Sequence, residues 1–99
     1  MTVRYEWDVE LTISGDTDDN EDGEVIDHRF CESYAQAKEI AALPPDDGTR
    51  NEIVLVRDDD YERSWAYIKG GKLPDYFTDA NGCDYVKVPK RFNAEVARA

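Results

Sequence analysis

Residues 3–13 alternate strictly between apolar and polar side chains, which restricts this part of the chain to one kind of element. A period of two is typical of a β-strand with one face on the core and the other in water. The polar positions are Arg4, Glu6, Asp8, Glu10 and Thr12. The pattern therefore predicts a strand whose wet face carries three exposed carboxylates about 6.8 Å apart.

A second strand is expected after an acidic stretch. Residues 14–24, SGDTDDNEDGE, contain no core-forming side chain and predict an acidic, mobile loop. In the following run, 24–30, Ile26, His28 and Phe30 fall on one side, as in a returning strand. Strand, loop and strand together predict a hairpin with a long connection.

One helix is expected near residues 34–42. Ser33 and Gln36 have the spacing of a capping box, in which the two side chains satisfy backbone groups at a helix start. Apolar side chains follow at helical spacing, at Tyr34, Ala37, Ile40 and Ala41. The pair Pro44-Pro45 ends the segment.

The second half predicts mainly strands. Residues 53–56 are apolar on both faces, as in a central strand, and 63–69 alternate with Trp65 and Tyr67 on one face. We expect 73–77 to be irregular or a single turn and 85–88 to be a short final strand. Pro89 favours a last helical turn, in which Phe92 and Val96 share a face.

This order, ββαβββ, defines the expected fold. Consecutive antiparallel strands with a helix on one face form an α+β two-layer sandwich. The length of 99 residues fits one domain, 1–99, with a sheet of about five strands, one packed helix and a short C-terminal helical turn.

The net charge of −11 is concentrated in one half of the chain. Residues 1–49 contain 14 Asp and Glu against three Lys and Arg, whereas residues 50–99 contain nine of each sign. Such acidity argues against direct nucleic-acid binding and against anionic membranes. The partners that it favours are a basic protein surface or cations, and its alternative purpose is solubility.

A cytoplasmic location is expected. The first residues contain no apolar signal core, and no window approaches the length of a membrane span. Cys31 and Cys83 lie far apart without a CxxC spacing, which favours reduced thiols.

The acidic half contains two candidate sites. The partner-binding candidates are Glu6, Asp8, Glu10, Asp16, Asp18, Asp19, Glu21, Asp22 and Asp27. Regularly spaced carboxylates resemble a phosphate backbone, so this surface is a candidate mimic of nucleic acid, recognised by a host protein that grips DNA or RNA. The metal candidates are Asp18, Asn20, Asp22 and Glu24.

The metal candidates match the first half of a calcium-binding loop. With Asp18 as position one, Gly23 stands at the turn position and Val25 at the apolar position. Position twelve is Arg29 in place of the usual Glu, so the closing ligand is missing. The alternative is an acidic loop that attracts cations only loosely.

No catalytic role is expected for this chain. Its carboxylates look exposed, and exposed carboxylates keep pKa values near 4, which makes them poor general bases at neutral pH. No nucleophile has a base beside it in the sequence. The aromatic group of the second half, Trp65, Tyr67, Tyr76 and Phe77, is interpreted as core, with a partner-binding patch as its alternative.

Three segments resemble a family of small acidic phage or prophage proteins of unknown function. They are WDVE at 7–10, SWAY at 64–67 and VPKRF at 88–92, about a third of the chain together with their flanks. The resemblance implies a small cytoplasmic protein of a phage or lysogen and no assigned catalytic residue. Its association with inhibitors of host enzymes favours the mimic hypothesis by analogy.

The function predicted from these observations is a non-enzymatic acidic interaction protein that binds a basic surface of a host protein. The alternatives are a calcium-binding domain formed by 18–25 and a phage structural or assembly component.

Overall fold

The computed structural model describes residues 2–13, 24–45 and 48–98 of the chain. Strands and helices follow one another in the order ββαββββα. The strands are β1 (Arg4–Ile13), β2 (Val25–Cys31), β3 (Thr49–Asp58), β4 (Arg63–Tyr67), β5 (Tyr76–Asp79) and β6 (Asp84–Lys87). The helices are α1 (Tyr34–Ala41) and α2 (Lys90–Arg98).

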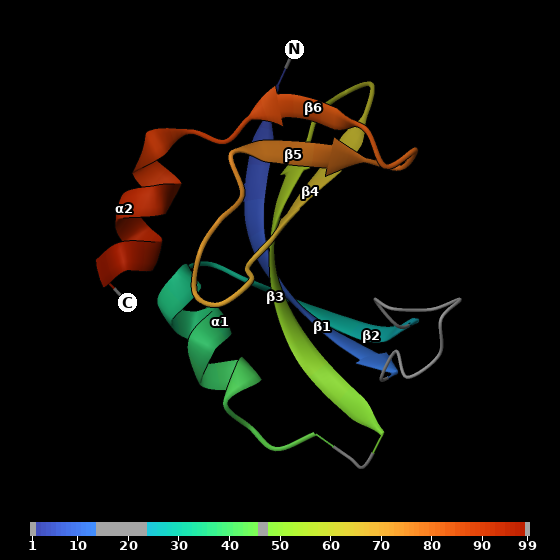
Figure 1. The fold of residues 1–99 in the computed structure, drawn as a ribbon, viewed down its shortest axis with the longest axis vertical. Helices are drawn as coiled ribbons and strands as arrows, with labels where there is room; N and C mark the ends of the chain where they lie inside the picture. The colour runs from blue at the N-terminus through green and yellow to red at the C-terminus, as the bar shows by residue number, and fades with distance from the viewer. Residues whose placement is uncertain (1, 14–23, 46–47, 99) are drawn as a thin grey trace.

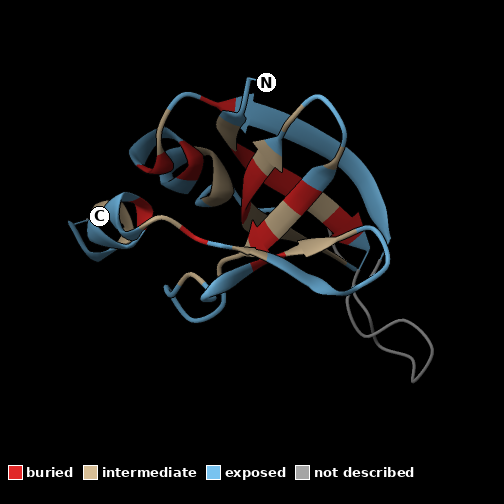
Figure 2. Ribbon diagram, turned by 90° about the horizontal axis from the view of Figure 1, so that it is seen from above, coloured by how far each residue is buried: buried red, intermediate tan, exposed pale blue. Residues whose placement is uncertain are grey.

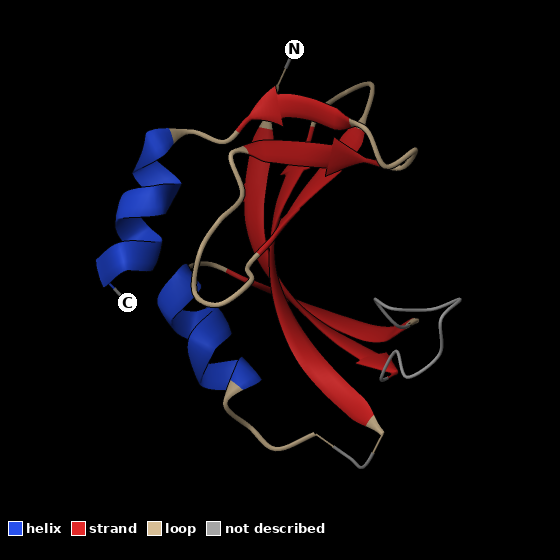
Figure 3. Ribbon diagram, viewed as in Figure 1, coloured by secondary structure: helices blue, strands red, loops and turns tan. Residues whose placement is uncertain are grey.

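All six strands belong to one antiparallel sheet, in the order β2-β1-β3-β4-β5-β6. Both helices lie on the same side of it, and the sheet bends away from them (Figures 1 and 3). The expected α+β architecture is thereby confirmed.

The two long strands β1 and β3 form the middle of the sheet. They pair over ten residues each, from Arg4 opposite Asp58 to Ile13 opposite Thr49. β3 is the central strand that its apolar run predicts, because β1 and β4 flank it and Val54, Leu55 and Val56 are all buried. Figure 2 shows the buried residues concentrated in these middle strands.

The core lies between the sheet and the helices. β1 contributes Trp7 and Val9, and the ring of Trp7 lies 5.0 Å from that of Tyr34 on α1 and 6.0 Å from that of Phe92 on α2. Phe77 of β5 is fully buried in the same cluster. The apolar stripe predicted for the first helix, from Tyr34 to Ala41, packs into this core as expected.

The capping box at the start of α1 is also confirmed. The backbone N–H of Gln36 donates to the Ser33 hydroxyl at 3.2 Å, and the Gln36 side chain accepts from the backbone N–H of Glu32 at 2.8 Å. At its other end α1 is capped by Ala42, just before the Pro44-Pro45 pair that was predicted to end the helix.

Two expectations for the second half are wrong. Residues 76–79 form strand β5 instead of an irregular segment, so the sheet has six strands and not about five. The C-terminal segment forms the nine-residue helix α2 instead of a single turn. β5 gave a weak signal because it is only four residues long and pairs with β4 at two positions.

No helix in the described ranges is long and apolar enough to cross a membrane.

Candidate functional site

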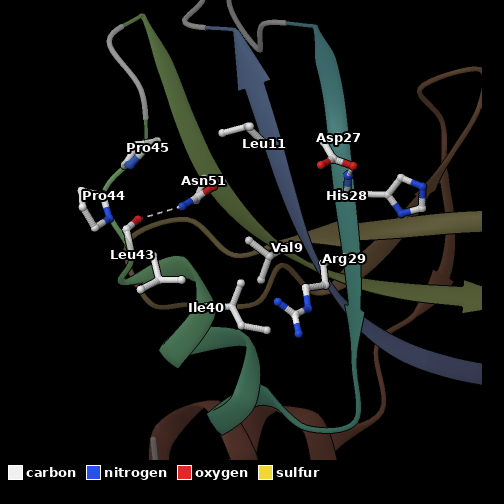
Figure 4. Close-up of a pocket in the computed structure, with 10 residues that line it drawn as sticks. All are labelled: Val9, Leu11, Asp27, His28, Arg29, Ile40, Leu43, Pro44, Pro45 and Asn51. Carbon is white, nitrogen blue, oxygen red and sulfur yellow. Dashed lines mark hydrogen bonds between the residues drawn. The ribbon is translucent and has the colours of Figure 1, made fainter.

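The face of the sheet opposite α1 and α2, here called the helix-free face, carries alternate residues of four neighbouring strands. The register places Asp8 of β1 beside Phe30 of β2 and Val54 of β3, and Val54 beside Tyr67 of β4. The residues of this face include Glu6, Asp8, Glu10, Thr12, His28, Phe30, Glu52, Val54, Val56, Arg63, Trp65 and Tyr67. Figure 4 shows the His28 ring on the opposite side of β2 from Arg29.

Two of the three carboxylates predicted to be exposed on this face are buried. Asp8 is 2% exposed and Glu10 is 7% exposed, while Glu6 remains partly exposed. The sequence predicted the correct face but the wrong environment. The reason is that this face has its own apolar floor, because Val54 and Val56 are fully buried beside the acids.

Asp8 lies among groups that balance its charge only in part. Its Oδ1 has no hydrogen-bond partner in the structure, and His28 Nδ1 lies 3.8 Å from it. Burial raises the pKa of the Asp8 carboxyl, and the neighbouring His28, the backbone N–H of Arg29 and the charge of Arg63 oppose that rise. Ionised Asp8 is therefore destabilised where it stands.

The negative charge of Glu10 is balanced by fewer neighbouring groups than that of Asp8. Its Oε1 also has no hydrogen-bond partner. Burial raises the pKa of the Glu10 carboxyl, and the neighbouring charge of Asp8 raises it further, whereas a hydrogen bond from Tyr67 lowers it. The charge of Asp8 thus disfavours the ionisation of Glu10, and the two side chains are here called the acid pair.

Ion pairs neutralise the other acids of the row. Arg4 Nη2 lies 3.1 Å from Glu6 Oε1, and Arg50 Nε donates to Glu52 Oε1 at 2.8 Å. The acid pair lies between these two ion pairs along β1 and β3. Of the four acids Glu6, Asp8, Glu10 and Glu52, the acid pair are therefore the two without an ion pair to an arginine.

A second group of buried polar atoms lies at the turn between β3 and β4. It contains Arg57 and Ser64, whose Oγ has no hydrogen-bond partner. Arg57 Nη1 lies 2.7 Å from Asp59 Oδ2, and its guanidinium lies 5.4 Å from the ring centre of Tyr85. Because a carboxylate balances Arg57, this group is consistent with a structural role.

The other predicted partner-binding residues are divided between the surface and the undescribed loop. Asp27 is exposed on β2, next to His28, whose backbone N–H donates to Asp27 Oδ1 at 2.9 Å. Residues Asp16, Asp18, Asp19, Glu21 and Asp22 lie outside the described residues. The partner-binding role of these loop acids therefore stays a prediction.

The predicted calcium ligands fall mostly in the same undescribed loop. Asp18, Asn20 and Asp22 lie outside the described residues, and Glu24 is exposed just before β2. Across the described ranges, no group of three or more His, Cys, Asp and Glu side chains is arranged to hold a metal ion. The calcium hypothesis stays a prediction about 18–25.

The aromatic group of the second half is split between two faces. Phe77 belongs to the core, as interpreted, while Trp65 and Tyr67 are partly buried on the helix-free face and Tyr76 is 47% exposed. Both cysteines are free thiols, with Cys31 buried and Cys83 exposed. Burial raises the pKa of the Cys31 thiol, which makes it a weak nucleophile.

A groove lies on the helix side, between α1 and the edge strand β2 (Figure 4). Its volume is about 300 Å³, and Val9, Leu11 and Ile40 form its apolar wall. Asn51 donates from its side chain to the carbonyls of Ala41 and Leu43, which fixes the end of α1 beside the groove. Sequence reasoning missed this groove because it depends on how far the helix and the sheet diverge.

Comparison with protein-family models, with curated proteins and with solved structures finds no match to this chain. The class of protein is therefore defined by the fold and the site alone: an α+β two-layer domain with a buried acid pair on the helix-free face of its sheet.

Proposed function

We propose that this protein is a non-enzymatic interaction protein that binds a basic partner protein, with a Lys or Arg side chain of the partner placed at the acid pair. The observation that supports the proposal is that Asp8 and Glu10 are buried and each keep an oxygen without a hydrogen-bond partner. A buried, unsatisfied carboxylate costs free energy, and a cationic donor that displaced the half-exposed His28 side chain from Asp8 would satisfy it.

The chain's own Arg63 supports the choice of a guanidinium or ammonium group. Its guanidinium lies 5.4 Å from the ring centre of Phe30, and its charge acts on Asp8. Phe30 is 41% exposed, so its ring is also accessible to a partner. A guanidinium against an aromatic face and a carboxylate combines cation–π and charge attraction.

The exposed acids would act at longer range. The excess charge of residues 1–49 includes Glu6, Asp27 and the loop acids, and such a field speeds the approach of a basic protein. The regular exposed row that a nucleic-acid mimic needs is not formed, because its Asp8 and Glu10 members are buried. The proposal is accordingly recognition of individual basic side chains, and a partner that normally binds nucleic acid remains compatible with it.

Binding of a hexa-arginine peptide, measured by titration calorimetry, distinguishes binding at the acid pair from general attraction to an acidic protein. The D8N/E10Q variant removes two charges at the acid pair, and the matched E32Q/E39Q variant removes two charges from exposed positions near and on α1. We expect D8N/E10Q to weaken binding about tenfold or more, since charge-assisted bonds contribute roughly 1.5–3 kcal/mol. E32Q/E39Q should change affinity by less than about threefold. Equal losses in the two variants would overturn the proposal.

We expect the R63Q substitution to have the opposite effect on the affinity for the hexa-arginine peptide. Arg63 is an internal counter-charge of Asp8, so its removal leaves the acid pair less compensated. We expect R63Q to bind the hexa-arginine peptide more tightly than the unmodified protein. Weaker binding would contradict the role assigned to Asp8.

A further inference from the structure

Strand β2 forms one edge of the sheet, and six of its seven residues are exposed. Its exposed side chains include Ile26 at 49% and Phe30 at 41%. Proteins usually shield such edges with short strands, prolines or charges, because an open edge pairs with other strands. β2 has seven residues and no proline, whereas the opposite edge, β6, has four residues.

The outward backbone groups of β2 belong to alternate residues. The backbone N–H of His28 donates to the Asp27 side chain and so is not directed at β1. In an antiparallel strand, outward groups recur at every second residue, which assigns them to Ile26, His28 and Phe30. Within the described residues these three form the outward hydrogen-bonding edge of the sheet, and pairing with another strand would replace the Asp27 carboxylate at the His28 N–H by a backbone carbonyl.

We propose that a second copy of this chain pairs with β2 through a twofold axis at His28, which joins the two sheets into one. In this register Asp27 of each copy faces Arg29 of the other, and Ile26 faces Phe30. Both kinds of contact stabilise antiparallel strands. An isologous pairing of this kind is the commonest arrangement of homodimers.

Charge complementarity selects this register from its neighbours. Shifting the twofold axis by one residue places Asp27 opposite Asp27, and shifting it the other way places Arg29 opposite Arg29. Like charges directly opposite are destabilising. Only the axis at His28 gives two opposite-charge pairs and two apolar pairs from the same seven residues.

The pairing has a consequence for the helix-free face, although it does not depend on the proposed function. Glu10 stands opposite His28 across β1 and β2, so two copies would place their Glu10 residues three strand spacings apart, about 14 Å. A twofold axis perpendicular to the sheet keeps both helix-free faces on the same side. The dimer would therefore present two acid pairs to one basic partner.

Sedimentation equilibrium over a range of protein concentrations tests the dimer. We expect the unmodified chain to dimerise, D27R and R29D each to weaken dimerisation by about tenfold or more, and D27R/R29D to restore it. A monomer at all concentrations would overturn the proposal. Single variants that dimerise normally, or a folded double variant that stays monomeric, would overturn the register.

Disulfide trapping tests the same register without altering charge balance between Asp27 and Arg29. Opposed residues of a hydrogen-bonded antiparallel pair have Cα atoms about 5.5 Å apart, within disulfide range. H28C/C83S should form a covalent dimer on mild oxidation. I26C/C83S should not, because the two positions 26 would lie about 14 Å apart along the strands. Equal crosslinking of both variants would contradict the axis at His28.

Discussion

At the residue scale, we expect Asp8 and Glu10 to lower the stability of the folded protein at neutral pH, compared with the neutral side chains Asn and Gln at the same positions. Burial raises the pKa of both Asp8 and Glu10, so the unfolded chain releases these protons more readily than the folded one. The resulting cost is present above the folded-state pKa and disappears as the pH falls below the unfolded values, near 4. This is the sign opposite to that of a carboxylate held in a strong ion pair.

We therefore expect D8N/E10Q to be more stable than the unmodified protein at pH 7, by about 1 kcal/mol or more, the lower end of the cost of a buried, unsatisfied charged group. The gain should shrink as the pH approaches 4. Urea unfolding between pH 4 and 8 measures it, with E32Q/E39Q as the exposed control. A loss of stability at pH 7 would show that the acid pair stabilises the fold. A stabilised variant that loses binding is the behaviour expected of a functional site.

The alternation of residues 3–13 predicted which face each side chain occupies but not how deeply it is buried. Trp7 and Val9 are in the core, as the pattern indicates, and Asp8 and Glu10 are on the other face. Their burial depends on side chains from β2, β3 and β4 and on the bend of the sheet, which the local sequence of β1 does not encode. The acid pair was a candidate from sequence, and its perturbed pKa values were not foreseeable.

At the scale of elements, α2 supports the start of α1. Glu95 Oε1 accepts a hydrogen bond of 2.8 Å from the backbone N–H of Tyr34, the first residue of α1. The free N–H groups and the dipole at a helix start favour such a carboxylate. Glu95 thus acts as a cap supplied by a distant segment, in addition to Ser33.

Replacement of Glu95 by alanine should lower the free energy of unfolding by about 1 kcal/mol, the usual cost of losing a helix cap. E95Q should lose less, because its amide oxygen is still an acceptor. Thermal unfolding followed by circular dichroism measures both effects, and E39Q, an exposed change on α1, is the control. If E95A and E39Q have the same stability, the contact does not contribute as a cap.

Local signals predicted some elements well and others poorly. The helix at 34–42 was predicted because its cap and its apolar stripe are contiguous in sequence, and α1 spans Tyr34–Ala41. β5 was missed because its stability comes from residues distant in sequence: it pairs with β4, and Phe77 packs in the core beside Trp7 and Tyr34. The length of α2 was underestimated because Phe92 anchors it against Tyr5 and Trp7 of β1.

For the whole molecule, the charge of the first half is not one uniform surface. Within the described residues, the acids of β1 divide into Glu6, which has an arginine partner, and the buried acid pair. Asp27 lies on the other face of the hairpin, where the proposed dimer needs it. The fold therefore separates acids that are close in sequence into a paired surface acid, a buried pair and an exposed acid on the other face.

A carboxyl ¹³C NMR titration of Asp8 and Glu10, with and without the hexa-arginine peptide, tests directly whether the acid pair binds a cation. A bound cation favours the ionised form of a carboxyl, and linkage requires the pKa to fall when the peptide binds. We predict elevated pKa values for both residues in the free protein and a decrease in both on binding. Shifts confined to exposed carboxylates such as Glu32 and Glu39, with Asp8 and Glu10 unchanged, would contradict the account.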